Sequence, residues 1–255
     1  MRICSCQRVI TLSLFSVLCS GALTSGTYAA TVMLGASKDN TLFSNESTGN
    51  VFSNALGSLF AGRTGPQGPG AQRALLAFDV ASAIPAGATI TDAQLTLDIA
   101  RSGGGSGNDV YTLHRVEKDW GEGTSDTTRG EGVAATPGDA TWIHTIFDSE
   151  TWDNPGGDFR ERGTASATLS NFGPATWEST TQMVLDVQAW LDDPSSNFGW
   201  ILIGDESVSS SSRQFGSRES SFGAPVLQIG YVIPEPTSAM LLLFGVAGAA
   251  TARRR

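Results

Sequence analysis

The stretch Arg73–Ala100, RALLAFDVASAIPAGATITDAQLTLDIA, contains the clearest strand patterns of the chain. In its second half apolar and polar side chains alternate, so that Leu95, Leu97 and Ile99 share one face. This period of two is typical of a half-buried strand and does not fit a helix. Ile84–Ala88 contains Pro and Gly and predicts a turn between two strands.

The first half of the stretch also alternates. Leu76 and Phe78 lie on one face, and Leu75 and Ala77 lie on the other. One inward face for each strand implies one outward face, which is the pattern of an antiparallel sheet rather than of a buried parallel sheet. The stretch therefore predicts an antiparallel β-sandwich.

Further short strand patterns follow at similar spacing, with polar or Gly- and Pro-rich turns between them. One segment, Met183–Leu191, has apolar residues at helical spacing and predicts a short helix. The many short strands predict an all-β, jelly-roll-like fold. The predicted strands are 110–116, 164–169, 177–184, 198–204 and 224–232, besides a short one from Thr31.

The N-terminal end reads as an export signal. Arg2 and Arg8 precede the apolar run Val9–Leu18, and small residues at Thr27–Ala29 predict cleavage near Ala29 or Ala30. This gives a signal peptide over residues 1–30 and a folded domain over 31–232. A lipoprotein signal at Cys19 is the alternative, although Ser16 stands where such signals have Leu.

All three cysteines, Cys4, Cys6 and Cys19, lie in that signal. The exported domain therefore has neither disulfides nor a Cys-based metal or catalytic site. Residues 31–236 contain 11 basic and 25 acidic residues, a net charge of −14. Such a field repels phosphates, so the sequence argues against nucleic acid as a partner.

The C-terminal end has three ordered parts: Pro234-Glu235-Pro236, the uncharged stretch Thr237–Ala252, and Arg253-Arg254-Arg255. As a helix, the uncharged stretch would be about 24 Å long, a little less than the ~30 Å of a bilayer core. The arginines would stay in the cytoplasm as a stop-transfer signal and leave the domain outside. The order of the parts predicts a hydrophobic helix over 233–255 that crosses the inner membrane.

This tail resembles the PEP-CTERM sorting signal of Gram-negative bacteria that export exopolysaccharide. The resemblance implies that an exosortase, a membrane transpeptidase-like enzyme, recognises Pro234, Glu235 and Pro236 and removes the tail. The protein would then be tethered to the inner membrane before processing and reach the cell surface or extracellular matrix afterwards. A plain C-terminal anchor is the alternative interpretation.

The domain resembles the DNRLRE family in the ordered blocks RALLAFDV, IPAGATITDAQLTL, HRVEKDWGEG, GDATW, WDNPGGDF, DVQAW, NFGW and SRES. These blocks cover about residues 37–231. The resemblance implies a jelly-roll-like sandwich and a polysaccharide-binding role, since some members bind polysaccharides such as alginate. The chain departs from the pattern at Ala77, where a basic residue is frequent, and in its acidic charge.

Sugar-binding modules present flat aromatic faces to sugar rings. Of the six tryptophans, Trp120 and Trp177 lie in polar surroundings and are the predicted carbohydrate platform. The other four fit the core or architectural blocks and are predicted to be structural. They are Trp142, Trp152, Trp190 and Trp200.

Several side-chain oxygens lie on predicted turns, and oxygen is the ligand that calcium prefers. None has the spacing of a calcium loop, so the sequence predicts a possible structural calcium without naming its ligands. The residues are Asp39, Asn40, Asp119, Glu122, Asp153, Asn154 and Asp158.

Signals for catalysis are weak. His114 and His144 have no nucleophile or metal motif beside them. The pair Asp119/Glu122 could in principle act as the acid and base of a glycosidase, but the simpler interpretation is that both are solvated acids. Arg213 and Arg218 with Glu219 predict a structural ion pair. We therefore expect an exported, non-catalytic protein that contacts polysaccharide. The alternatives are a polysaccharide-cleaving enzyme and a structural matrix protein without sugar affinity.

Overall fold

The computed structural model describes residues 27–68, 70–104 and 109–234, and these residues are mostly β-structure. The two helices are α1 (Val80–Ala83) and α2 (Thr181–Asp192), and single 3-10 turns cover Glu46–Thr48 and Pro194–Ser196. The strands are β1 (Thr27–Gly35), β2 (Lys38–Phe43), β3 (Phe52–Ser53), β4 (Leu59–Arg63), β5 (Ala71–Ala77), β6 (Thr89–Ser102), β7 (Asp109–Arg115), β8 (Val133–Ala134), β9 (His144–Ile146), β10 (Glu150–Thr151), β11 (Ala165–Leu169), β12 (Gly173–Trp177), β13 (Trp200–Ile203), β14 (Arg213–Phe215) and β15 (Val226–Pro234).

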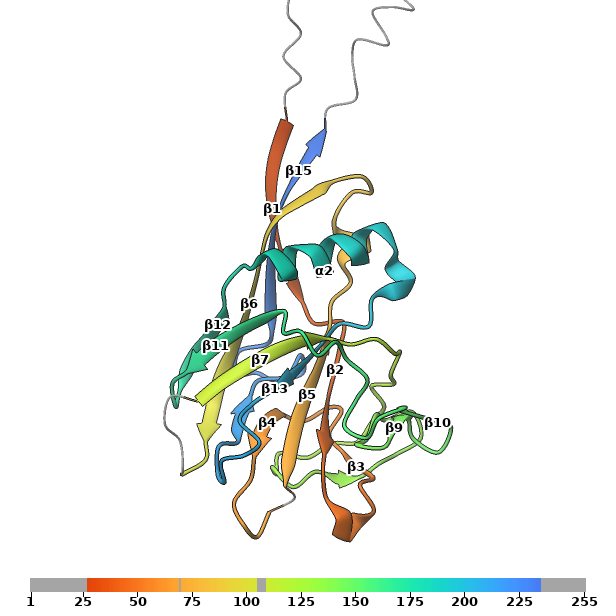
Figure 1. Ribbon diagram of the computed structural model, residues 1–255, viewed down its shortest axis with the longest axis vertical. Helices are drawn as coiled ribbons and strands as arrows, with labels where there is room; N and C mark the ends of the chain where they lie inside the picture. Colours follow the sequence, from red (N-terminus) through yellow and green to blue (C-terminus); the bar gives the residue numbers. More distant parts are fainter. Residues whose placement is uncertain (1–26, 69, 105–108, 235–255) are drawn as a thin grey trace, which may run out of the picture. The chain divides into compact units, whose positions relative to one another are not determined.

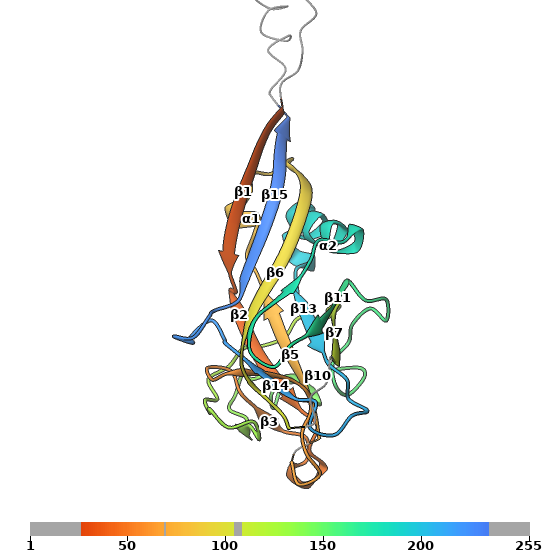
Figure 2. The same ribbon diagram turned by 90° about the vertical axis from the view of Figure 1, so that its left-hand side faces the viewer.

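Eleven of these strands form one antiparallel sheet that curls back on itself as a half-barrel (Figures 1 and 2). One wall contains β1, β15, β6 and β12, and the other contains β2, β5, β13, β7 and β11. The short strands β14 and β4 join the two walls, because β14 pairs with both β6 and β4. The prediction of an all-β antiparallel fold is confirmed, whereas the jelly-roll order of strands is not.

The main core lies between the two walls. Leu95, Leu97 and Ile99 of β6 face Leu76 of β5 and Trp200 of β13, and all five side chains are buried. Helix α2 covers the core (Figure 1), and its Trp190 ring packs against that of Trp200, with ring centroids 4.5 Å apart and planes tilted by 58°. Burial of these large apolar side chains is the main stabilising contribution of the fold.

The predicted helix is confirmed, but the predicted strand over 177–184 is wrong. Trp177 ends β12, and the Thr180 hydroxyl accepts a hydrogen bond from the Met183 amide at 3.0 Å. This N-cap starts α2 at Thr181, so Val184 belongs to the helix. The apolar residues of 177–184 therefore belong to two elements: Trp177 to β12, and Met183 and Val184 to α2.

Strand β5 also departs from the expected pattern, because both of its faces are buried. Leu76 belongs to the main core, while Leu75 and Ala77 belong to a second apolar cluster on the other face of the same wall. Trp120 and Trp152, from the largely irregular segment 116–160, complete that cluster. The face that was expected to point outward is thus covered by a loop.

The compact unit runs from Thr27 to Pro234, a few residues beyond the predicted domain of 31–232 at each end. Thr27 lies opposite Pro234 in the pairing of β1 with β15. Of the predicted signal, residues 1–26 lie outside the described residues, and 27–30 form the start of β1. Of the predicted C-terminal helix, 233 and 234 belong to β15, and the rest of it, with the Arg cluster, lies outside the described residues. Among the described residues, no helix is long and apolar enough to span a membrane.

One buried carboxylate connects α2 to the wall that contains β7, β11 and β13. Asp186 accepts hydrogen bonds from Thr164 at 2.6 Å and from the Trp200 indole at 3.1 Å, and its other oxygen lies 3.7 Å from Arg115. Asp186→Asn should destabilise the domain by about 3 kcal/mol, because it leaves the buried Arg115 guanidinium without a counter-charge. Urea unfolding measures this loss.

The matched control is Asp192→Asn, at an exposed position of the same helix. We expect it to change the free energy of unfolding by no more than about 0.5 kcal/mol. Equal effects of the two substitutions would show that the buried ion pair is unimportant for stability.

Candidate functional site

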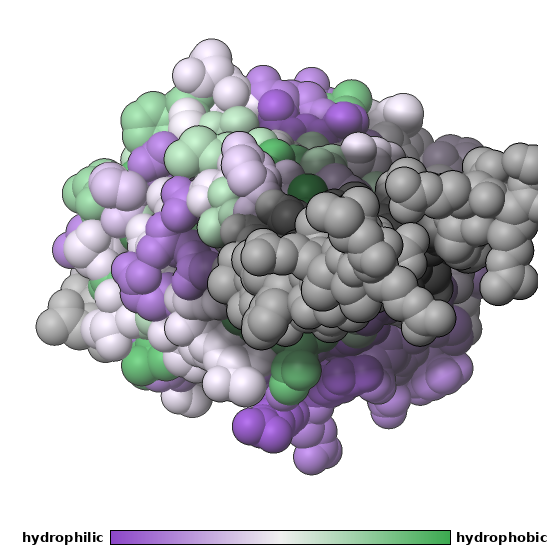
Figure 3. Space-filling model, turned by 90° about the horizontal axis from the view of Figure 1, so that it is seen from above, coloured by the Kyte–Doolittle hydropathy of each residue, from purple (hydrophilic) through white to green (hydrophobic). Residues whose placement is uncertain are grey.

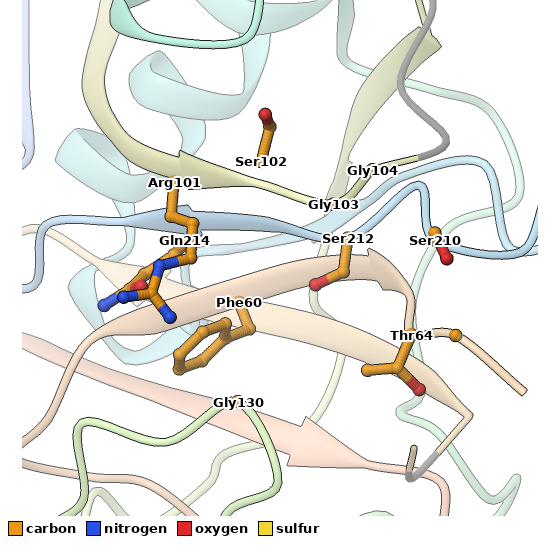
Figure 4. A pocket seen from close by; sticks show the side chains of 11 residues that line it. Phe60, Thr64, Arg101, Ser102, Gly103, Gly104, Gly130, Ser210, Ser212 and Gln214 are labelled. Atoms are coloured by element: carbon orange, nitrogen blue, oxygen red, sulfur yellow. The ribbon is translucent and has the colours of Figure 1, made fainter. Parts of the chain in front are cut away.

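Two adjoining recesses form a groove where β4, β14 and the end of β6 meet the loop 125–132 (Figure 4). Their cavity volumes are about 220 and 560 Å³, and both are lined by Thr64, Arg101 and Gly130. Phe60 and Gln214 also line the first recess. Volumes of this size suit one or two residues of a polar ligand such as a sugar.

The register of the sheet places three of the lining side chains in one row. Gln214 of β14 lies opposite Phe60 of β4 and opposite Arg101 of β6. Figure 4 shows the three side chains on the same side of these strands, at the opening of the recess. Directly paired residues of neighbouring strands point to the same face, so the row follows from the pairing itself.

A β-bulge in β6 is what turns Arg101 outward. Ile99 pairs with Phe215 and Arg101 pairs with Gln214, so Ala100 is the extra residue between them. Without the bulge, the alternation of Leu95, Leu97 and Ile99 would place Arg101 on the buried face. With it, Ile99 remains buried and Arg101 is exposed.

A short chain of hydrogen bonds holds the loop that forms the far side of the groove. The Gln72 side chain donates a hydrogen bond to the Gly130 carbonyl and accepts one from the Ser212 hydroxyl. A Cβ atom at Gly130 would lie 3.2 Å from the ring of Phe60. Gly130 therefore lets the loop approach the aromatic floor of the groove closely.

The groove gathers positive charge in an otherwise acidic domain. Arg101 and Arg129, which line it, are exposed and make no ion pair among the described residues. Seven other basic residues do make ion pairs: Lys38, Arg73, Arg115, Lys118, Arg160, Arg213 and Arg218. Two guanidinium groups are therefore free to bind an anionic ligand.

The predicted aromatic platform is wrong for both tryptophans. Trp120 is 2% exposed and Trp177 is fully buried. The Trp120 indole donates to the Phe198 carbonyl at 2.9 Å and that of Trp177 to the Tyr111 carbonyl at 2.9 Å. Both rings serve as core residues whose one polar atom is satisfied, so neither presents a face to a sugar.

Three of the seven predicted oxygen ligands, Asp39, Asn40 and Glu122, come together beside Arg218 rather than around a metal, and a fourth, Asp119, forms an ion pair of its own. The Arg218 guanidinium binds both oxygens of Glu122, at 2.8 and 2.9 Å, and also lies 2.7 Å from Glu219. Asp39 accepts from the Arg218 amide at 2.8 Å and donates its own amide to Glu122. Asn40 donates to the Glu122 carbonyl, and Asp119 pairs with Lys38 nearby.

The other three form a separate turn. The Asp158 carboxylate accepts hydrogen bonds from the amides of Asp153 and Asn154, at 2.7 and 2.9 Å. In the part of the chain that the structure describes, no group of three or more His, Cys, Asp or Glu residues could hold a metal ion. The predicted structural calcium is not confirmed.

The two histidines and the predicted arginine ion pairs bond to neighbouring parts of the fold. His114 is hydrogen-bonded to the Arg160 carbonyl and His144 to the Thr141 hydroxyl. Of the predicted Arg213, Arg218 and Glu219 group, Arg218 does pair with Glu219, while Arg213 is buried against Asp109 at 3.2 Å.

Sequence reasoning missed Phe60, Arg101, Arg129 and Gln214 as site residues. Their nearest signals are the Gly-rich stretches at 61–72 and 102–108, of which Thr64, Gly65 and Ser102–Gly104 line the first recess. No pattern in the sequence marks the bulge at Ala100, which depends on pairing with a strand more than a hundred residues later.

Comparison with known families identifies the C-terminal end. Residues 232–255 match the PEP-CTERM protein-sorting motif. The protein is therefore exported, is anchored in the membrane before exosortase removes the tail, and then reaches the surface or the extracellular space. The resemblance of the domain to the DNRLRE family has no such support, and no curated protein matches the chain closely enough to count as a relative.

Asp39 provides a test of the Arg218 cluster. Burial, together with the nearby Glu219 and Glu122, raises the pKa of Asp39 from 3.8 to about 8, against the opposing effects of the Arg218 amide and guanidinium. The folded protein thus holds a proton that the unfolded chain loses above about pH 4. Stability should fall as the pH rises from about 4 to 8, by up to about 1.4 kcal/mol per pH unit.

Asp39→Asn should flatten this dependence, because the amide cannot ionise. We expect urea midpoints of the wild-type protein to decrease between about pH 5 and pH 8 while those of the variant change less. Asp153→Asn, in the exposed turn, is the control and should follow the wild type. Parallel profiles for wild type and Asp39→Asn would contradict this assignment.

Proposed function

We propose that this exported protein binds an anionic polysaccharide of the cell envelope or extracellular matrix, without cleaving it, in the groove between β4, β6, β14 and the loop 125–132. The observation that carries the proposal is the pair Arg101 and Arg129, which line one recess beside a single acid, Glu131, and make no ion pair among the described residues. Guanidinium groups bind carboxylates through two parallel hydrogen bonds, which suits a uronic acid polymer.

The acidic net charge of the domain weakens the long-range attraction of any polyanion, as it does for nucleic acid, but it acts less on contacts at the groove. Exposed charges more than a Debye length apart, about 8 Å at physiological salt, are largely screened from each other. Binding of a polyanion therefore depends more on the charges at the groove than on the sum over the whole protein. The polar atoms of Thr64, Ser210 and Gln214, which line the same recess, can bond to sugar hydroxyls.

The position of the groove suits a protein that is held at a membrane before processing. Strand β6 pairs at Thr89 with Val232, next to the sorting tail, and at Ser102 with Arg213, next to the groove. Its 14 residues separate these two ends. At ~3.3 Å per residue the separation is about 40 Å, so Val232, where the matched sorting motif begins, and the groove lie at opposite ends of the strand.

The lining residues favour binding over bond cleavage. The described residues of the first recess include no Asp, Glu, His or Cys, and the second contributes only Glu131. Cleavage of glycosidic bonds usually needs two carboxylates flanking the bond. A non-catalytic role for this groove is therefore the simpler assignment.

Affinity electrophoresis tests the proposal. The wild-type protein should be retarded in gels that contain a polyuronate and less so in gels that contain a neutral glucan. Arg101→Ala should weaken the binding by about tenfold, since a hydrogen bond to a charged group contributes about 1.5 kcal/mol or more. Added salt should weaken it as well.

Arg162→Ala is the matched control, because Arg162 is also exposed and makes no ion pair among the described residues but lies outside the groove. It removes the same charge and should leave retardation unchanged. Equal loss in both variants would indicate nonspecific attraction. Release of oligosaccharides would support an enzyme, and absence of any retardation would support a matrix protein without sugar affinity.

A further inference from the structure

The last residues of β15 lie where the fold ends and the sorting motif begins. β15 pairs with β6 only as far as Val232, which lies opposite Thr89. Ile233 and Pro234 pair with β1 alone, opposite its first two residues. Figures 1 and 2 both show β1 and β15 side by side up to this end.

The residues of β1 that cover this end belong to the predicted leader. Cleavage after Ala29 or Ala30 hydrolyses one peptide bond with one water molecule and removes Thr27–Ala29 from the domain. These three residues lie opposite Pro234, Ile233 and Val232. The mature chain therefore lacks the strand partner of the segment that enters the sorting motif.

We propose that the mature end of β15, Val232–Pro234, is an open strand edge that the processing enzyme binds by adding an extended strand of its own. An open edge presents unpaired backbone N–H and C=O groups. Strand addition uses these groups for affinity, whatever the side chains are. In a chain that keeps its leader, β1 covers the same edge, so the N-terminal cut precedes the C-terminal one.

The composition of β1 and β15 supports strand addition at this edge. Sheet edges that must stay unpaired usually carry charged side chains, which discourage strand addition. Neither β1 nor β15 contains a charged residue, although the described chain is rich in acids. In Figure 3, which views the molecule from above, hydrophobic and hydrophilic residues are interspersed on the surface that is drawn in colour.

The inference does not depend on polysaccharide binding and can be tested by itself. Two forms of the protein, both with the complete tail, are prepared with their first residue at Thr27 or at Thr31 and incubated with exosortase in liposomes. The form that begins at Thr31 should lose its tail about tenfold faster, the size expected for the four cross-strand pairs that it lacks. Hydrogen exchange should show less protection of Val232 and Ile233 in that form.

A proline variant separates the pairing from chain length. Successive amides of a strand point to opposite sides, so either Tyr28 or Ala29 donates toward β15, and the double substitution Tyr28→Pro and Ala29→Pro removes that donor. In the form that begins at Thr27, it should restore fast processing. The control, Tyr28→Thr with Ala29→Val, keeps the strand and should remain slow.

Circular dichroism melting shows whether each form is folded before processing is compared. Equal rates for the two starting points overturn the proposal, as does failure of the enzyme to process the folded form that begins at Thr31. A proline variant that exposes Val232 and Ile233 to hydrogen exchange but remains slow overturns it as well.

Discussion

Burial of both faces of β5 and β13 is the constraint on which the rest of the structure depends. Leu76 and Trp200 face the main core, while Leu75 and Ile201 face the second cluster. A strand that is apolar on both faces must be covered twice. The second cover is the segment 116–160, which has little regular structure and no cysteine to hold it.

Tryptophans and buried polar groups hold that segment in place. Trp120 and Trp152 insert into the second cluster, and Lys38 lies 4.3 Å from the centre of the Trp120 ring. The buried Asp139 accepts hydrogen bonds from the amides of Thr124 and Thr136, at 2.8 and 2.6 Å. Each contact satisfies a group that would otherwise be buried without a partner.

Arginines bind many of the carboxylates in this acidic domain. Arg218 binds Glu122 and Glu219 beside the buried Asp39, in the region where the sequence suggested oxygen ligands for a cation. A guanidinium group forms several directed hydrogen bonds, so one Arg can orient two carboxylates and offset part of their charge. Arg101 and Arg129 are the contrast, since their charges face a groove and remain available to a ligand.

Strand β6 runs from the end of β15, where the sorting motif begins, to the proposed binding groove. Its first half supports β15 and the exit to the sorting tail, and its last residues form one side of the groove. The bulge at Ala100 lets a single strand contribute Ile99 to the core and Arg101 to the surface. Position along this strand therefore separates processing from the proposed binding.

The sequence by itself determined the features that depend on neighbouring residues. The alternation in residues 73–100 predicted antiparallel strands, the helical spacing near Val187 predicted α2, and the order of motif, apolar stretch and arginines predicted the sorting tail. Such signals depend on local periodicity or on linear motifs, so they can be read without knowing the fold.

Only the tertiary structure decided which surfaces are left for function. The burial of Trp120 depends on Phe198, 78 residues away, and the exposure of Arg101 depends on its pairing with Gln214. Polar neighbours in the sequence made Trp120 and Trp177 look exposed, whereas the neighbours that bury them come from distant strands and loops. Exposure is a property of contacts between remote residues, and a local pattern does not contain it.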